Sequence, residues 1–384
     1  MALSVFLCQS SALCWAQEPV EGSGLPSVAL EKPDSHGGFN LYAIPPHGRV
    51  IIGGTGVGTM TSPSGSETFG GEIVVWAPAT GKLIRTYGTH ATTPSFLGFP
   101  NDEGSFVSFS REDAVLKVWR TESPGLLRSV SLGAPGGMDD APALSADGVS
   151  FVRMAARSLP HENNDDKDAH IPEVSFRLEA WDIAKGTQRW AIETDSANGE
   201  LDVKFATTAD SKSLAVAVKE LEWTNANGQF RGNHSADEWI GMLSLADGKP
   251  LWRLEKSAAK EMWRGSIKEI LLTPDGKEML LVMRDAIERR SAVDGARLAP
   301  PINLKSKDSI ARVWVVAQGK RIMIQRFMNK AVDIVAFPSG ETLQSIEFAW
   351  PDTLRNVVPN ADFTRIVGTL GFNPSVLDCS PPKD

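Results

Sequence analysis

The chain has 384 residues, of which 42% are hydrophobic, so it is long enough and apolar enough to bury a large core. Its 39 basic and 47 acidic residues give a net charge of −8, which argues against a broad surface for nucleic acid or anionic membranes. The 34 glycines and 24 prolines are typical of an all-β chain with many turns.

The first segment, residues 1–16, is apolar and carries no charged side chain. It resembles a secretory signal peptide that lacks the usual basic start, and it predicts export to the periplasm or the extracellular space. A disordered start or a misplaced start codon is the alternative interpretation. Cys8 and Cys14 would leave with the signal, and the remaining Cys379 could form no internal disulfide. We expect a linker over residues 17–26, and no later run approaches the ~20 apolar residues of a membrane span.

Two kinds of turn alternate along residues 27–379. The first precedes an apolar strand and occurs seven times, around His47, Glu103, Asp147, Asp210, Asp275, Gln318 and Ala361. The second ends in glycine, which accepts a positive φ without steric cost. It occurs six times, at Gly81, Gly125, Gly186, Gly248, Gly295 and Gly340.

This alternation predicts repeating units of four strands, called a, b, c and d in chain order. The units fall at about residues 39–88, 95–131, 141–194, 201–255, 267–302, 310–348 and 354–378. The last unit lacks strand d, and a spare strand-like run, Ser27–Glu31, precedes the first. Because an open sheet edge invites unwanted pairing, we predict that this run closes the last unit. The predicted fold is a seven-bladed β-propeller of four-stranded antiparallel blades, followed by a disordered tail at residues 380–384.

Two short motifs carry a resemblance to known repeat families. Trp181-Asp182 matches the dipeptide of WD-repeats, and the spacings Gly186 to Trp190 and Gly248 to Trp252 look like those of quinoprotein-type repeats. The chain therefore resembles the WD-repeat and quinoprotein-like propellers, which implies an architecture but no particular activity. It has no cysteine pair of the kind that quinoprotein dehydrogenases often contain, and we predict no cofactor.

Three long insertions separate strands b and c, at Thr55–Gly70, Arg157–Pro172 and Glu220–Asp237. We predict surface loops there. The b–c and d–a connections of a four-stranded blade leave the disc on the same side, so all three would crowd one face, which is the first candidate for binding.

The second insertion is rich in possible metal ligands, namely His161, Asp165, Asp166, Asp168 and His170. Carboxylates and imidazoles so close together could hold a divalent cation. They match no known ligand spacing, however, and acidic loops of this kind are more often simply solvated. We therefore predict no metal and keep these residues as candidates.

Several tryptophans invite a functional interpretation. Trp76, Trp119 and Trp181 occupy equivalent positions on strand c, which predicts packing between blades. Trp223, Trp263 and Trp350 fall in predicted loops of the insertion face, and His234 falls in the same insertion as Trp223. Exposed tryptophans often anchor partners, so these residues are the partner-binding candidates. The alternative is that each is covered by its own loop.

Two functions follow as hypotheses. The favoured one is an exported, non-enzymatic scaffold, monomeric on its own, that binds a protein through the insertion face. The alternative is a hydrolase or oxidoreductase with a site at the mouth of the central channel, built from His90, Asp139, Asp140, Glu200 and Asp308. No nucleophile elbow or phosphate-binding loop supports it, and we expect His47 and His90 at the surface. No catalytic residue is assigned.

Overall fold

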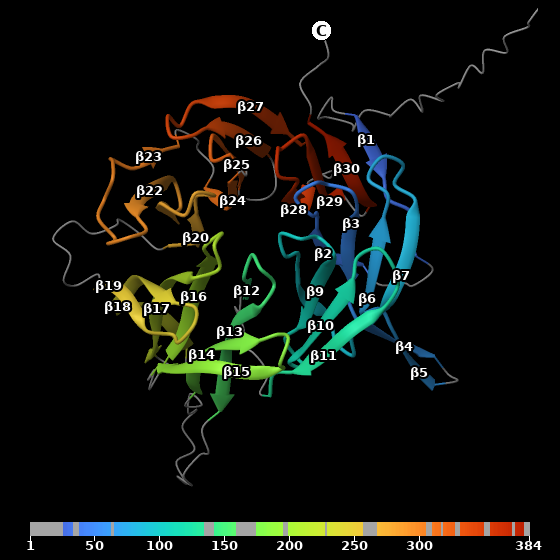
Figure 1. The fold of residues 1–384 in the computed structure, drawn as a ribbon, viewed down its shortest axis with the longest axis horizontal. Coiled ribbons are helices and arrows are strands. Elements are labelled where there is room, and N and C mark those ends of the chain that lie inside the picture. The colour runs from blue at the N-terminus through green and yellow to red at the C-terminus, as the bar shows by residue number, and fades with distance from the viewer. Residues whose placement is uncertain are drawn as a thin grey trace, which may run out of the picture.

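Seven four-stranded antiparallel sheets form a ring, as Figure 1 shows. The structure is a computed structural model that describes residues 26–33, 38–62, 65–133, 142–158, 174–194, 199–226, 229–255, 267–304, 309–315, 318–326, 331–348, 354–370 and 373–379. In each blade the first strand lies nearest the ring centre and the last strand lies at the rim (Figure 1). The predicted seven-bladed propeller is therefore confirmed.

The first four blades follow one another along the chain. Blade 1 contains β2 (Phe39–Ala43), β3 (Ile51–Thr55), β6 (Glu72–Trp76) and β7 (Leu83–Thr89). Blade 2 contains β8 (Pro94–Gly98), β9 (Ser105–Ser110), β10 (Val115–Arg120) and β11 (Leu126–Ser131). Blade 3 contains β12 (Ala143–Leu144), β13 (Ser150–Ser158), β14 (Val174–Asp182) and β15 (Thr187–Thr194). Blade 4 contains β16 (Gly199–Thr207), β17 (Ser213–Ala226), β18 (Gln229–Ser244) and β19 (Pro250–Glu255).

The last three blades are shorter, and the seventh joins both ends of the described chain. Blade 5 contains β20 (Glu269–Leu272), β21 (Glu278–Val282), β22 (Ala286–Ser291) and β23 (Ile302–Asn303). Blade 6 contains β24 (Ile310–Val315), β25 (Arg321–Arg326), β26 (Ala331–Ala336) and β27 (Thr342–Glu347). Blade 7 contains β28 (Leu354–Pro359), β29 (Arg365–Leu370), β30 (Asn373–Asp378) and the early strand β1 (Ser27–Ala29).

Closure of the ring depends on the pairing of β1 with β30. The two strands are antiparallel, with Val28 opposite Val376, and the Asp378 amide donates to the Pro26 carbonyl at 3.0 Å. Next to this strand, the indole nitrogen of Trp76 in blade 1 donates to the Glu31 carbonyl at 2.7 Å. The predicted closing strand is thus confirmed, and it is bonded to both of its neighbours.

All seven first turns contain one residue in the left-handed region, with φ between +52° and +71°; these are Gly48, Glu103, Gly148, Ser211, Gly276, Gly319 and Phe363. An aspartate often supports the turn. The Asp210 carboxylate accepts from the Thr208 hydroxyl at 2.6 Å and from the Lys212 amide at 3.1 Å. These local hydrogen bonds between side chain and backbone stabilise the turn and end the preceding strand.

Five of the six second turns also share one geometry. Their glycines have φ between +67° and +79°, and each glycine N–H donates to the carbonyl four residues earlier at 2.8–2.9 Å; they are Gly81, Gly186, Gly248, Gly295 and Gly340. Gly125 differs, because one extra residue precedes it and its carbonyl instead accepts from the Arg120 amide.

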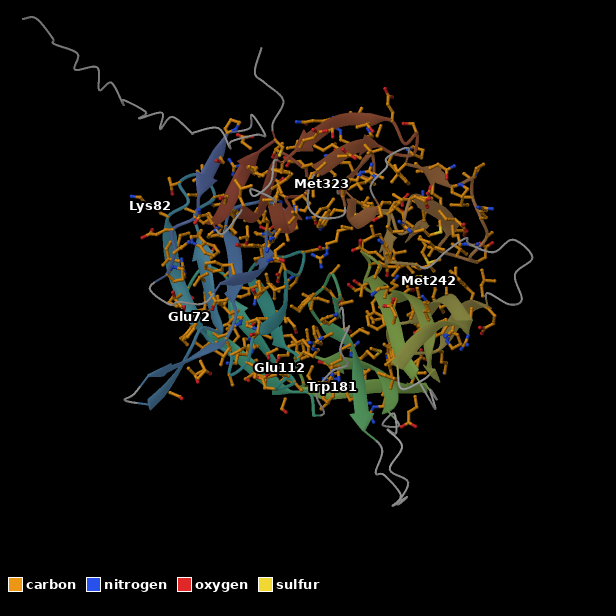
Figure 2. All side chains as sticks on the ribbon, turned by 180° about the vertical axis from the view of Figure 1, so that it is seen from behind. Glu72, Lys82, Glu112, Trp181, Met242 and Met323 are labelled. Carbon is orange, nitrogen blue, oxygen red and sulfur yellow. The ribbon has the colours of Figure 1, made fainter. Side chains whose placement is uncertain are left out.

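The hydrophobic core lies between neighbouring blades. One cluster joins Val152 of blade 3 to Val216 of blade 4, and another joins Met323 of blade 6 to Leu377 of blade 7. Figure 2 shows side chains filling these spaces around the ring. Trp76 and Trp119 are buried as predicted, whereas Trp181 is only partly buried.

Two of the three predicted loops are strand pairs instead. Within Thr55–Gly70, β4 (Gly58–Ser62) pairs with β5 (Gly65–Phe69). Within Glu220–Asp237, β17 and β18 continue as a ladder until Ala226 lies opposite Gln229. The missed signal is the Asn227-Gly228 dipeptide between them, since Asn-Gly favours a two-residue hairpin turn. In the third insertion the ladder reaches Ser158 opposite Val174, and residues 159–173 lie outside the described part.

Candidate functional site

Most of the site residues expected from the sequence lie outside the described part of the chain; these are His161, Asp165, Asp166, Asp168, His170, Trp263, Trp350, Asp139, Asp140 and Asp308. Trp223 and His234 belong to β17 and β18, so their predicted placement in a loop is wrong. In the backbone ladder Trp223 lies opposite Gly232, and His234 lies opposite Leu221. Glu200 belongs to β16.

His90 is the one member of the predicted channel-mouth set whose side chain is described, and the surface position expected for it is wrong. Its side chain is 3% exposed, whereas His47 is exposed as predicted. Nε2 of His90 lies 2.7 Å from the Ser108 hydroxyl, and the same hydroxyl accepts from Nε1 of Trp119 at 2.7 Å. Hydrogen bonds therefore link three side chains in series, from the connection between blades 1 and 2 into blade 2.

The hydrogen bond between His90 and Ser108 can run in either direction, depending on the tautomer of the imidazole. A serine hydroxyl has one proton to donate. If Ser108 accepts from Trp119 and donates to Nε2 of His90, the proton of the neutral ring lies on Nδ1, which has no hydrogen-bond partner among the described residues. If Nε2 carries the proton, the Ser108 hydroxyl accepts from both rings. Burial lowers the pKa of His90 to about 4, with Lys117 contributing in the same direction and Asp113 opposing it. The ring is therefore neutral at pH 7.

A hollow of about 370 Å³ adjoins His90 at the base of the β4–β5 hairpin. We call it the hairpin-base pocket; its lining residues are Val57, Thr68, Phe69, Gly70, Glu72, Thr89, His90 and Ala91. This size is near the lower end of the ~300–1,000 Å³ that is usual for small-ligand sites. The pocket lies where the b–c connection of blade 1 meets the d–a connection that leads into blade 2.

Main-chain hydrogen bonds fix the walls of this pocket. The His90 amide donates to the Gly71 carbonyl at 2.8 Å, and the Val57 amide donates to the Thr93 hydroxyl at 2.9 Å. Gly70 has a φ of +88°, and a Cβ built there would lie 1.9 Å from the Gly56 carbonyl oxygen. Only glycine allows so close a backbone approach. The walls are therefore preformed.

Two polar atoms at the pocket lack a hydrogen-bond partner among the described residues, namely Oε2 of Glu72 and Nδ1 of His90. A buried polar atom without a partner usually costs about 1–3 kcal/mol. Glu72 lines the pocket, although its Oε2 atom is buried. Sequence reasoning missed this pair, because the residues become neighbours only through the β6–β7 ladder, which sets Glu72 opposite Thr89.

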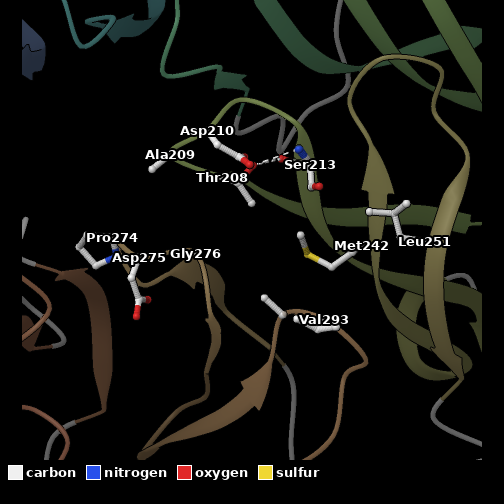
Figure 3. A pocket seen from close by; sticks show the side chains of 11 residues that line it. Thr208, Ala209, Asp210, Ser213, Met242, Leu251, Pro274, Asp275, Gly276 and Val293 are labelled. Atoms are coloured by element: carbon white, nitrogen blue, oxygen red, sulfur yellow. Dashed lines mark hydrogen bonds between the residues drawn. The ribbon is translucent and has the colours of Figure 1, made fainter.

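A second hollow, of about 640 Å³, lies between the first turns of blades 4 and 5 (Figure 3). Leu251 and Val293 line it and are 58% and 81% exposed. Asp210 and Asp275 also line it, but each carboxylate accepts a threonine hydroxyl and a backbone N–H of its own turn. These hydrogen bonds lower the pKa of both groups. The carboxylates therefore stabilise their own turns, and we interpret this hollow as a gap between two neighbouring blades and not as a binding site.

The described residues contain no cluster of three or more histidine, cysteine, aspartate or glutamate side chains arranged to hold a metal ion. Among the same residues, no helix has the length and apolar character needed to cross a bilayer. Cys379 is buried, which raises the pKa of its thiol to about 12.

Comparison with known proteins places the fold. A solved structure of the β-propeller domain of Cps50 (Swd1) from Myceliophteria thermophila superposes with a TM-score of 0.61 at 13% sequence identity. The match covers 92% of this chain and 100% of that domain. The chain shares the fold of that propeller. This similarity shows the β-propeller fold alone, and no family model and no curated protein matches the sequence.

Proposed function

We propose that the chain is an exported, non-enzymatic β-propeller that binds a protein partner through the face on which its long b–c hairpins lie. The observation that carries the proposal is the extension of these hairpins. Strands β17 and β18 have 14 and 16 residues, whereas the equivalent β21 and β22 of blade 5 have 5 and 6. A rigid ring that extends selected loops is the usual form of a binding scaffold.

The other two b–c extensions lie on the same face. The β4–β5 hairpin and the long β13–β14 pair occupy the equivalent connection of blades 1 and 3. Connections between equivalent strands leave a propeller on the same side, so three of the first four blades enlarge one face. The similarity to the Cps50 (Swd1) propeller agrees with a scaffold, because that fold is a common platform for loops that carry function.

Export is part of the proposal and rests on residues 1–16, which are apolar and uncharged. Fractionation of cells that express the full chain, with mass analysis of its N-terminus, tests this part. Recovery outside the cytoplasm with cleavage near Ala16 would support export. An intact N-terminus on cytoplasmic protein would refute it and leave the binding proposal standing.

The binding proposal is tested by shortening one hairpin. Lys219 and Glu238 lie opposite each other, so an Asn-Gly turn can join them in place of residues 220–237. We expect this variant to lose the proteins captured by the wild type in a pull-down while its melting temperature stays unchanged. A second variant without Arg157–Pro172 should lose capture in the same way.

The matched control changes the opposite end of the blades. Val293 is 81% exposed on a second turn of blade 5, and Val293→Ser should leave capture unchanged. If both shortened variants capture the same proteins as the wild type, the face is assigned wrongly.

A further inference from the structure

We propose that the seam between blades 5 and 6 binds an acidic segment of a partner protein through Lys268, Arg284 and Arg312. The inference rests on the proposed function and deepens it, because it names the chemistry that one part of the proposed face recognises. It begins from cationic side chains that are exposed at this seam and have no carboxylate within ion-pair distance among the described residues.

Two hydrogen bonds to the main chain of Ile310 bring Lys268 and Arg284 to the same point of blade 6. Nζ of Lys268 donates to the Ile310 carbonyl at 2.8 Å, and the Ile310 amide donates to the Arg284 carbonyl at 2.8 Å. Arg284 lies in the tight turn between β21 and β22, which the Met283 amide closes by donating to the Ala286 carbonyl at 2.9 Å. The turn is therefore held against the start of β24, and little ordering is required on binding.

The positive charges of this pair are not compensated. Lys268 and Arg284 are both exposed, so a ligand can reach them. By contrast, the exposed Lys212 and Lys277 lie 3.9 and 3.8 Å from an aspartate of their own turn. Partial burial lowers the pKa of the Lys268 ammonium, and the positive charge of Arg284 lowers it further. A bound carboxylate would relieve this repulsion and accept hydrogen bonds from both groups.

The nearest acidic side chain of strand β20, Glu269, is bonded to the main chain inside the seam. Its Oε2 atom accepts from the Val313 amide at 3.0 Å. Burial raises the pKa of Glu269, while the positive charges of Arg312 and Lys204 act in the opposite direction. Arg312 therefore lies near this carboxylate, yet it is exposed and forms no ion pair with it.

The spread of the charges favours an acidic peptide over a compact anion. Lys268 and Arg284 belong to blade 5, whereas Arg312 lies on β24 of blade 6, two residues after Ile310. An extended segment can place successive carboxylates against these cations, but a small anion can meet only some of them at once. Asp285 is exposed beside Arg284 in the sequence and pairs with none of the three cations.

The seam also lies on the proposed binding face. The turn at Arg284 is the b–c connection of blade 5, and Ile310 follows the d–a connection between blades 5 and 6. Strands β20 and β24 border the centre of the ring (Figure 1). Since β21 and β22 have only 5 and 6 residues, the seam is a low part of this face next to the long β17–β18 hairpin. A partner that contacts the hairpin can therefore reach the seam.

The test uses a small probe, so it does not depend on finding the partner. N-acetyl-triglutamate amide is titrated at low ionic strength and pH 7 into the full chain labelled with ¹⁵N-arginine. We expect saturable shifts of the amide and Nε–H signals of Arg284 and Arg312, with binding in the millimolar range. N-acetyl-triglutamine amide has nearly the same shape without the charges and should bind roughly ten-fold more weakly. Inorganic phosphate should also bind more weakly than the acidic peptide, because it is compact.

The decisive variants are Lys268→Gln and Arg284→Gln, which each remove one positive charge and should weaken binding of the acidic peptide several-fold. Lys277→Gln is the matched control, because it removes the same charge from a first turn of blade 5, on the opposite side of the ring. It should bind the peptide like the wild type. Arginine signals of Lys268→Gln that match the wild type away from the seam show that the variant is folded.

Three results would each overturn the proposal: equal binding of the glutamine peptide, tighter binding of phosphate than of the acidic peptide, and equal affinities of Lys268→Gln and Lys277→Gln. If the probe fails while the shortened hairpins still abolish capture, only this inference falls.

Discussion

The indole nitrogen of Trp190 in blade 3 donates a hydrogen bond to the Leu245 carbonyl of blade 4 at 2.9 Å. Its ring also covers the second turn of that blade, since a Cβ built on Gly248 would lie 2.8 Å from the ring. One blade further on, the Trp252 indole donates to the Ala292 carbonyl at 2.9 Å and covers Gly295 in the same way. Blades 3, 4 and 5 are thus joined by one repeated contact.

This contact predicts the effect of adding a methyl group at the turn. Gly248→Ala forces alanine into a left-handed backbone at φ +73° and pushes its Cβ into Trp190. We expect a loss of about 2–4 kcal/mol in the free energy of unfolding, measured by chemical denaturation. Gly276→Ala is the control, because Gly276 has φ +68° with nothing within 4 Å of a built Cβ. It should cost only about 1–2 kcal/mol, and equal losses would refute the role of Trp190.

A second prediction concerns the buried carboxylate of Glu179 in blade 3. It accepts from Arg153 at 3.0 Å, from Arg177 at 2.8 Å and from the Trp181 indole at 2.9 Å. The Arg153 side chain is 0% exposed, so Glu179→Ala strands a buried cation and should cost about 3–5 kcal/mol. Glu255→Ala breaks the exposed pair with Arg253 and should cost less than about 1 kcal/mol. Similar losses in the two variants would contradict this account.

The third prediction is a pH dependence. Folding lowers the pKa of His90 from 6.5 to about 4, so the unfolded chain binds a proton more readily than the folded one. Above pH 6.5 the lowered pKa of His90 has almost no effect on the free energy of unfolding. As the pH falls towards 4, it reduces the free energy of unfolding, by about 1 kcal/mol at pH 5.5. Lys117 and Asp113 act electrostatically on the ring, and Glu72 lines the same pocket. His90→Gln should flatten the change in unfolding free energy between pH 7 and 5.5, and an unchanged slope would refute the assignment.

The fourth prediction addresses ring closure. Leu30 is 3% exposed beside the closing strand, and its amide donates to the Pro374 carbonyl at 2.8 Å. Leu30→Ala removes buried apolar volume from the seam between blades 7 and 1 and should cost about 2–5 kcal/mol. Leu126→Ala is the control, because Leu126 is 49% exposed and should change the unfolding free energy by less than about 0.5 kcal/mol. Equal effects would mean that the seam contributes little to stability.

The sequence predicted the architecture well because turns are local. Glycines such as Gly186 and aspartates such as Asp210 act through bonds to residues a few positions away, so their pattern was enough to count seven blades and to assign the closing strand. The site was harder to predict. Glu72 and His90 meet only through strand pairing, and the burial of His90 depends on Ser108 and Trp119 of the next blade. The long β17–β18 hairpin was not predicted, because a long polar insertion is also typical of a loop; the local sign of a hairpin is the dipeptide Asn227-Gly228.

The seam between β1 and β30 also sets an order of assembly. Residues 27–29 are synthesised well before their partners at 375–377. Blades 1 to 6 can each form from consecutive residues, but the seventh cannot be finished until β30 has been synthesised. A product truncated before Asn373 would keep most blades and lack the strand that seals them. Its first strand would then remain an unpaired edge, open to pairing with a strand of another molecule.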